Sequence, residues 1–203
     1  MKVFLFTLAL ATFHLATFAQ GKVTFGNDAN HLIVIDPNGI WLGWAGKNPA
    51  LAGLAAPQTG TVNDVMSSLT AQLWAGPSAG SLTVQSILNP AGLAGLPDGR
   101  IGNIPVTLTG IAGGATGFYQ ILIFETAAGS YANASDPLTI GRWYASTPVF
   151  SGSAGSFAPT PLTSMTGWTA GNITLTATPP LPEPSTFVLA GLGIASLLLF
   201  RRR

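Results

Sequence analysis

Cysteine is absent from this chain of 203 residues, and charged residues make up only 7% of it. Without a thiol, the protein cannot form a disulfide, a thiolate zinc site or a cysteine nucleophile. Between two apolar ends the chain has few cations, namely Lys22, Lys47, Arg100 and Arg142. Nucleic-acid binding needs a clustered basic face that replaces phosphate counterions, so we expect no nucleic-acid partner.

Histidine is also scarce, and His31 is the only one that follows the first apolar segment. A single imidazole cannot form a multi-histidine metal site, and its position at an expected strand start favours a structural role. The acidic residues are isolated, without a nucleophile-elbow or paired-carboxylate signature. The oxygen-bearing residues within 27–30 and 36–38 fit turns better than a calcium loop. We therefore expect a protein that is not an enzyme, with no catalytic residue, metal or cofactor.

Glycine and proline are abundant, with 25 and 15 residues respectively. Together with the low charge, this composition favours short strands and many turns over surface helices. Apolar residues alternate with threonine or glutamine at 173–178, 106–109 and 82–85, as in strands with one buried face. Residues 118–124 are almost entirely apolar on both faces, which is typical of a central strand. The sequence therefore predicts an all-β, antiparallel β-sandwich body.

Two further segments predict local structure within this body. The Asp-Pro-Asn-Gly sequence at 36–39 lies between apolar runs at 31–35 and 40–44, so we expect a tight β-hairpin there. In residues 63–73, apolar residues have both helical and alternating spacing. We expect a short helix or turn that leads into a strand at 69–74.

The N-terminus has the pattern of a cleavable export signal. Met1 and Lys2 form a small positive region, residues 3–13 are almost wholly apolar, and residues 17–19 end in Ala19 before Gln20. These three features are those of a signal peptide that signal peptidase removes between Ala19 and Gln20. An uncleaved membrane anchor or a buried helix is the alternative. We therefore expect an exported protein whose mature chain begins at Gln20.

The C-terminus joins a proline-rich segment to an apolar one and a basic end. The proline-rich segment stays extended and accessible because proline fixes φ and lacks an amide donor. Residues 187–200 predict a transmembrane helix of about 21 Å, which is short against a hydrocarbon core of about 30 Å. The terminal arginines halt translocation and keep the C-terminus in the cytoplasm. The residues concerned are Pro182, Glu183, Pro184, Ser185 and Thr186 in the first segment, and Arg201, Arg202 and Arg203 at the end.

This tail resembles the PEP-CTERM sorting signal of exported bacterial proteins, in which a Pro-Glu-Pro signature precedes a membrane helix and a basic cluster. The resemblance implies that an exosortase processes the chain near residues 182–184 and that the body reaches the cell surface or the medium. It also implies an inner-membrane intermediate and a link with exopolysaccharide. A permanent single-pass anchor remains the alternative, because these residues define the topology without proving cleavage.

The chain therefore divides into a signal peptide at 1–19, a β-sandwich body at 20–178 and a sorting tail at 179–203. Residues 71–77 and 118–131 resemble segments of a small uncharacterised β domain that recurs in PEP-CTERM proteins. That second resemblance carries no known activity. We expect a non-catalytic protein of the cell surface or the extracellular matrix.

Tryptophan supplies the main alternative function, because aromatic faces stack on sugars. The five tryptophans are Trp41, Trp44, Trp74, Trp143 and Trp168. Residues three apart on a strand point to opposite faces, so we expect at least one of Trp41 and Trp44 to be exposed. A carbohydrate-binding module with tryptophans on one sheet face is the second hypothesis. A secreted hydrolase with two neighbouring acids is the third.

Overall fold

A computed structural model describes residues 20–39, 42, 47–58, 65–89, 96–126, 142–165, 168 and 171–177. The expected signal peptide at 1–19 and the sorting tail at 179–203, with its transmembrane helix at 187–200, lie outside these residues. Within the described part of the chain, no helix is long and apolar enough to cross a membrane. The described body consists mostly of β-strands, as the sequence predicts.

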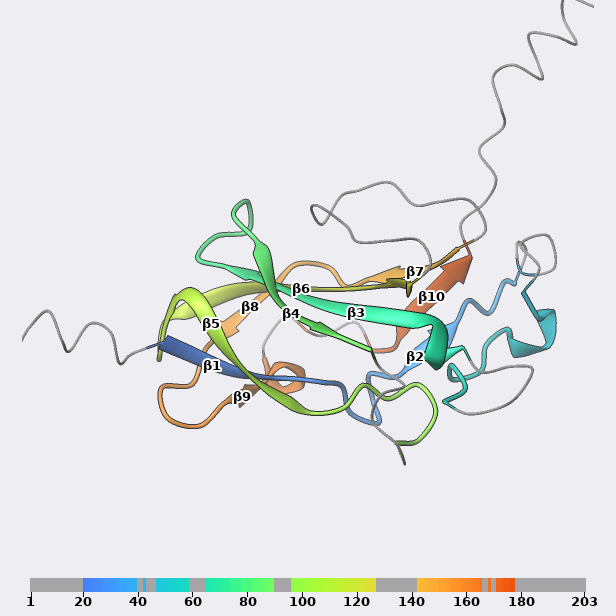
Figure 1. Cartoon of the computed structure of the whole chain (residues 1–203), viewed down its shortest axis with the longest axis horizontal. Helices are drawn as coiled ribbons and strands as arrows, with labels where there is room; N and C mark the ends of the chain where they lie inside the picture. Colours follow the sequence, from blue (N-terminus) through green and yellow to red (C-terminus); the bar gives the residue numbers. More distant parts are fainter. Residues whose placement is uncertain are drawn as a thin grey trace, which may run out of the picture.

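The strands form two sheets, which Figure 1 shows as two layers along the long axis of the body. In the smaller sheet the strand order is β5-β1-β9, and in the larger it is β2-β10-β7-β6-β3-β4, with β8 also paired to β6. The smaller sheet contains β1 (Gln20–Phe25), β5 (Ile104–Ala112) and β9 (Thr160–Pro161). The larger contains β2 (Ile33–Ile35), β3 (Leu69–Gly76), β4 (Thr83–Leu88), β6 (Thr116–Glu125), β7 (Trp143–Ser146), β8 (Phe150–Ser153) and β10 (Ile173–Ala177).

Most of the strand pairs are antiparallel, which confirms that part of the prediction. The long β3–β6 pair runs in continuous register from Leu69 opposite Glu125 to Gly76 opposite Phe118. Two pairs are parallel, namely β1 with β9 and β10 with β2. Parallel strands need a long connection, and here more than a hundred residues separate β1 from β9 and β2 from β10.

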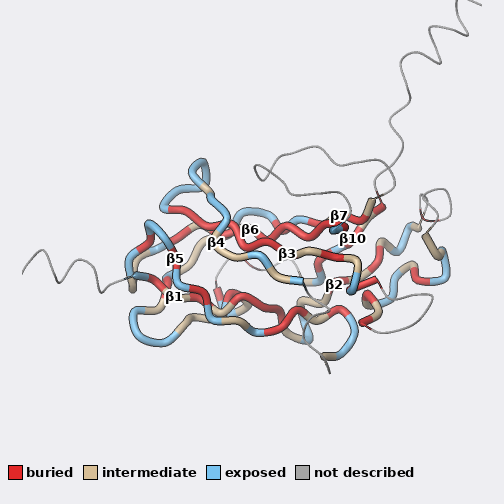
Figure 2. Tube along the Cα trace, viewed as in Figure 1, coloured by how far each residue is buried: buried red, intermediate tan, exposed pale blue. Residues whose placement is uncertain are grey.

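One hydrophobic core joins the two sheets, and Figure 2 shows buried residues along both layers. In β10, Ile173, Leu175 and Ala177 are buried, while Thr174 is exposed. The same alternation in β5 buries Val106 and Leu108 and exposes the threonines beside them. Burial of each large aliphatic side chain contributes about 1.5–3 kcal/mol. The alternation that the sequence predicts at these two strands is confirmed.

β6 is the central strand that the sequence predicts at 118–124. It lies between β3 on one side and both β7 and β8 on the other. Tyr119, Ile121 and Ile123 are fully buried in the shared core, and Leu122 and Phe124 are buried on the opposite face. Phe118 is only half buried.

The alternation expected at 82–85 is wrong in detail, although a strand is present. In β4, Val84 is 38% exposed and Ile87 is 61% exposed. The register with β3 shifts between Leu73 opposite Ser86 and Trp74 opposite Val84, so Gln85 is an extra residue. Such a bulge reverses which side chains face each side of the sheet. The shift in register with β3, the strand directly before it in the chain, therefore overrides the local pattern of β4.

The turn at 36–39 is confirmed. Gly39 has a φ of 58°, and its N–H donates to the Asp36 carbonyl oxygen at 3.2 Å. The antiparallel neighbour of β2, however, is the segment at 53–56, where Ile35 N–H donates to the Leu54 carbonyl at 2.9 Å. Leu42, from the expected partner run at 40–44, lies in a turn, and most of that run lies outside the described residues. The hairpin partner of β2 is therefore a later segment than the sequence indicates.

Short 3-10 helices complete the described body, at Pro49–Leu51, Met66–Ser68 and Leu162–Ser164. The second of these leads directly into β3, whose first residue is Leu69. This arrangement confirms the short helical turn followed by a strand that the sequence predicts for residues 63–73.

Candidate functional site

The two ends of the described body lie far apart, at opposite ends of its long axis in Figure 1. Gln20, the expected first mature residue, begins β1 and is exposed. Ala177, the last described residue, pairs with Trp143 at the end of β10. Ala19, the proline-rich motif at 182–186 and the arginines at 201–203 lie outside the described residues.

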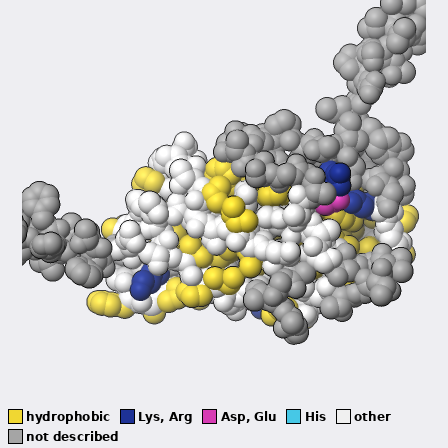
Figure 3. Space-filling view, viewed as in Figure 1, with side chains coloured by type: hydrophobic (Ala, Val, Ile, Leu, Met, Phe, Trp, Pro, Cys, Tyr) yellow, Lys and Arg dark blue, Asp and Glu magenta, His cyan; other side chains and the backbone are white. Residues whose placement is uncertain are grey.

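A group of ionised side chains lies at the end of the body where β6, β7 and β10 meet. Lys47 Nζ lies 2.6 Å from Glu125 Oε2, and Arg142 Nη1 lies 2.9 Å from Glu125 Oε1. The Trp143 N–H donates to Glu125 Oε2 at 3.1 Å, and Lys47 Nζ lies 5.1 Å from the centre of the Trp143 ring. Figure 3 shows basic and acidic side chains side by side at this end of the molecule.

Glu125 is almost fully buried, so its charge needs these partners. Burial alone would raise the pKa of the Glu125 carboxyl, but hydrogen bonds from Lys47, Trp143 and Arg142 outweigh it and lower that pKa. The carboxylate is therefore held ionised by its neighbours, which is a structural arrangement rather than that of a general acid.

His31 is paired with an acid that the sequence analysis does not assign to it. His31 Nδ1 lies 2.6 Å from Asp28 Oδ1, and the His31 ring makes an edge contact with Trp168 at 5.4 Å between centroids. The partial burial of Asp28 acts to raise the pKa of its carboxyl, but hydrogen bonds from His31 and from the Asn30 N–H lower it. The i, i+3 spacing of Asp28 and His31 across a turn is the sequence signal that indicates this pair.

The oxygen-bearing turns have the geometry expected of turns. Asp28 Oδ1 accepts from the Asn30 N–H, and Asp36 Oδ1 accepts from the Asn38 N–H, both at 2.9 Å. Such side-chain bonds to the backbone two residues later define Asx turns. Among the described residues, no three histidine or acidic side chains gather as metal ligands would.

Asn27 joins two distant segments with three hydrogen bonds. Its Nδ2 donates to the His31 carbonyl at 2.7 Å and to the Gly99 carbonyl at 2.8 Å, while its Oδ1 accepts from the Ile101 N–H at 2.6 Å. Asn27 is only 1% exposed. A fully buried amide with every bond made to the backbone is a structural residue and not a ligand for a cation.

Tyr119 has a buried hydroxyl with no hydrogen-bond partner in the described part of the chain. Burial raises the pKa of this phenol to about 12. Space for the hydroxyl is left by Gly117, since a Cβ there would lie 2.6 Å from Tyr119 Oη. The hydroxyl is therefore neutral and enclosed in the core.

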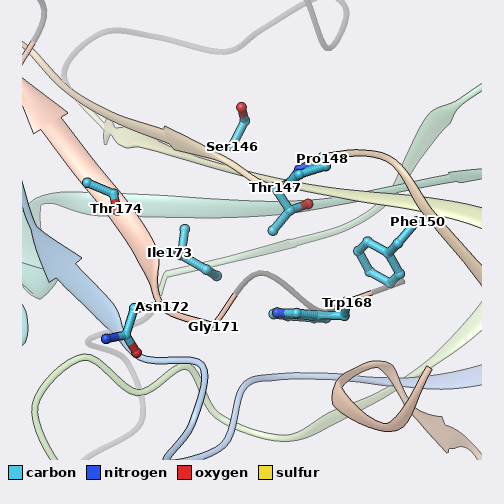
Figure 4. A pocket seen from close by; sticks show the side chains of 9 residues that line it. All are labelled: Ser146, Thr147, Pro148, Phe150, Trp168, Gly171, Asn172, Ile173 and Thr174. Carbon is cyan, nitrogen blue, oxygen red and sulfur yellow. The ribbon is translucent and has the colours of Figure 1, made fainter. Parts of the chain in front are cut away.

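A pocket of about 170 Å³ lies on the larger sheet, between the β7–β8 connection and the start of β10 (Figure 4). Ser146, Thr147 and Phe150 line it on one side, and Asn172 and Thr174 line it on the other. Trp168 and Ile173 complete the apolar part of the lining. The lining contains no ionisable side chain.

The pocket exists because β10 and β7 diverge. They pair only at Thr176 opposite Tyr144 and at Ala177 opposite Trp143. Before those positions β10 pairs with β2 instead, while Thr147 stays on β6 through its N–H and hydroxyl, each 3.0 Å from backbone atoms of Ile121. The aromatic side chains of Phe150 and Trp168 lie at the bottom of the resulting opening in the sheet.

The described tryptophans do not form the exposed platform of the carbohydrate-binding hypothesis. Trp74, Trp143 and Trp168 are 4%, 3% and 5% exposed respectively. Trp74 Nε1 donates to Gln72 Oε1 at 3.0 Å on the buried outer face of the sheet. Trp41 and Trp44, which we expected to point to opposite faces, lie outside the described residues.

Comparison with known proteins places the C-terminal tail in a class. The chain matches the PEP-CTERM protein-sorting motif over residues 180–203. This match covers the proline-rich segment, the apolar segment and the terminal arginines, and it confirms the resemblance seen in the sequence. Neither a curated protein nor a solved structure matches the chain.

The protein therefore carries the sorting signal of an exported protein that an exosortase processes. The motif implies passage through the membrane toward the cell surface. The match is confined to the tail, so the body between residues 20 and 178 is characterised by its structure alone.

Proposed function

We propose that this protein is a non-catalytic component of the cell surface or extracellular matrix, delivered by an exosortase. The observation that carries the proposal is the sorting motif at 180–203. A signal-peptide pattern at 1–19 supports it. A signal peptide starts export of a chain, and an apolar segment followed by arginines halts its translocation, so the two signals fit one route.

The proposed route has two cleavages. Signal peptidase cuts between Ala19 and Gln20, and the helix at 187–200 then holds the chain in the inner membrane with the body outside the cytoplasm. The exosortase cuts near residues 182–184, and the body passes to the cell surface or the medium. The separation of Gln20 and Ala177 along the body supports this route, since the two processing enzymes would act at opposite ends (Figure 1).

The body that is delivered is proposed to be a β-sandwich of residues 20–178. Two sheets that share one hydrophobic core support this reading. A non-catalytic role is supported by the acids with ion-pair partners: Glu125 is held by two cations, Asp28 is held by His31, and neither lines the pocket. Exopolysaccharide is the matrix partner that the resemblance of the tail implies.

Alanine replacement of Pro182, Glu183 and Pro184 tests the sorting role. We expect the body to be exported but to stay in the membrane fraction, because the apolar segment and the arginines remain. Replacement of Pro179 by alanine is the matched control, since it removes a neighbouring proline and leaves the matched residues 180–203 intact. Membrane fractionation and mass measurement of the mature protein from its native host distinguish the two variants.

A motif variant that is cleaved and released like its parent would refute a sorting role for the Pro-Glu-Pro signature. If the parent itself keeps residues 187–203 in its mature mass, the tail is a permanent single-pass anchor instead. N-terminal sequencing adds a check on the first cleavage, because a mature chain should begin at or near Gln20.

A further inference from the structure

The pocket between β7 and β10, which we call the β7–β10 pocket, has the volume of a single ring. Its volume is about 170 Å³. An engineered apolar cavity of about 150 Å³ holds one benzene molecule, so the β7–β10 pocket holds one six-membered ring. Because the pocket opens to solvent between exposed residues, substituents on such a ring can extend outward.

The lining selects a neutral ligand. All of its side chains are uncharged, and the backbone N–H of Thr147 already donates to the Ile121 carbonyl oxygen. An ion entering the pocket would lose part of its hydration without gaining a counter-charge, which is unfavourable. Carboxylates, phosphates and amines are therefore poor ligands for this site.

The lining is also divided into an apolar floor and a polar mouth. Trp168 and Phe150 are buried, with their ring centroids 5.2 Å apart, and Figure 4 shows the Trp168 ring edge-on with Phe150 beside it. Ser146, Asn172 and Thr174 are exposed at the opening. A ring that fits both parts needs an apolar face and hydroxyl groups around its edge.

The groups at the pocket are held in position before any ligand binds. Asn172 Oδ1 accepts from the Leu32 N–H at 3.1 Å, which orients the side-chain amide and leaves its NH₂ group as a donor. The Trp168 ring packs against the rings of Phe150 and His31. His31 is itself paired with Asp28. Preorganised groups bind with less loss of side-chain entropy.

From this chemistry we infer that the β7–β10 pocket binds one neutral pyranose residue, with its C–H face toward the apolar floor that Trp168 and Phe150 form together and its hydroxyls toward the polar mouth. Sugars combine an apolar C–H face with a polar edge, and aromatic rings are the side chains that stack on that face. A purely aromatic ligand would leave the polar mouth unused. The inference concerns the body alone and does not depend on how the tail is processed.

The test follows the indole N–H signals of the full-length chain by ¹⁵N-correlated NMR, in a detergent without a sugar head group. Glucose, galactose, mannose and N-acetylglucosamine are the probes, and Trp168→Phe identifies the Trp168 signal. At least one neutral sugar should shift that signal saturably, with a Kd of about 1–10 mM, as suits a single-ring contact. Glucuronate should bind at least about tenfold more weakly than the corresponding neutral sugar.

Two variants separate binding at the pocket from an effect on folding. Thr174→Leu narrows the mouth and should weaken binding about tenfold or more, whereas Thr107→Leu, an exposed strand threonine of the other sheet, should leave it unchanged. Asn172→Asp keeps the oxygen that accepts from Leu32 but removes the donor, and should weaken binding about fivefold or more. Unchanged indole spectra without sugar would show that each variant is folded.

Three outcomes would overturn the inference. The first is no shift of the Trp168 signal with any of the four sugars up to about 100 mM, roughly tenfold above the expected Kd. The second is a shift with phenol but with none of the sugars, which would identify a site for an apolar ring. The third is sugar-dependent shifts of other tryptophans alone, which would move binding to another surface.

Discussion

Replacing Asn27 by alanine removes three hydrogen bonds at once from the join between the β1–β2 segment and the loop before β5. The Ile101 N–H loses its partner in a buried setting, whereas the Gly99 carbonyl keeps the Ile33 N–H at 2.9 Å and the His31 carbonyl is only partly buried and can be solvated. Each buried backbone group left unpaired costs about 1–3 kcal/mol. One such group, together with the weaker loss of a second hydrogen bond at Gly99, gives an expected loss of about 2 kcal/mol in the free energy of unfolding.

For a domain of this size, a loss of about 2 kcal/mol corresponds to a decrease of roughly 4–8 °C in Tm. Thermal unfolding followed by tryptophan fluorescence measures it, because three tryptophans are buried in the described body. Asn30→Ala is the matched control: Asn30 is exposed, three residues away, and its side chain is expected to contribute less than about 0.5 kcal/mol.

Asn27→Asp adds a second test of the same geometry. The aspartate keeps an oxygen for the Ile101 N–H but directs its other oxygen at the His31 and Gly99 carbonyls. At pH 7 it should therefore destabilise the body at least as much as alanine does. Repulsion raises the pKa of this carboxyl in the folded state, so the deficit should shrink as pH falls and the acid becomes a donor. An Asn27→Ala variant within about 0.5 kcal/mol of its parent would refute the reasoning.

Two further predictions concern buried polar groups. Tyr119→Phe removes a hydroxyl that is buried without a partner, so it should leave the free energy of unfolding unchanged or raise it by about 1 kcal/mol. A decrease of more than about 1 kcal/mol in that free energy, measured by denaturant titration, would show that the hydroxyl is hydrogen-bonded. The pKa of Glu125 is lower in the folded protein, so its contribution is fully present above its unfolded pKa of about 4.3 and is lost as pH falls through the folded value. Glu125→Gln should lower the free energy of unfolding at pH 7 and make Tm depend less on pH between 7 and about 3. If the variant and its parent lose Tm equally over this range, the carboxylate is not ion-paired.

The sequence predicts those features of the fold that depend on neighbouring residues. Alternation in β5 and β10 and the two apolar faces of β6 follow from side chains a few positions apart, and the structure agrees with each. β4 differs because its exposed residues depend on a bulge opposite Leu73 and Trp74, ten or more residues away. A pattern read along one strand contains no information about register with another.

The candidate site shows the same limit. The tail is recognisable from its sequence because its proline-rich segment, apolar segment and terminal arginines follow one another in the chain. The β7–β10 pocket joins residues around 147 to residues around 172, and it depends on where β10 leaves β7 for β2. The burial of Trp74, Trp143 and Trp168 is likewise a property of the packed sheets, so residue type alone could not separate core from surface.

β10 is the last strand of the described chain, yet it lies inside the larger sheet, between β2 and β7. A chain exported from its N-terminus delivers both neighbours before the strand that joins them, so the sheet stays open until nearly the whole body is outside. Only residues 178–181 then separate β10 from Pro182, and an extended stretch of that length spans at most about 14 Å. On the proposed route, closure of the sheet and arrival of the sorting motif therefore fall in the same final step of translocation, and the processing enzyme would meet the chain as its fold becomes complete.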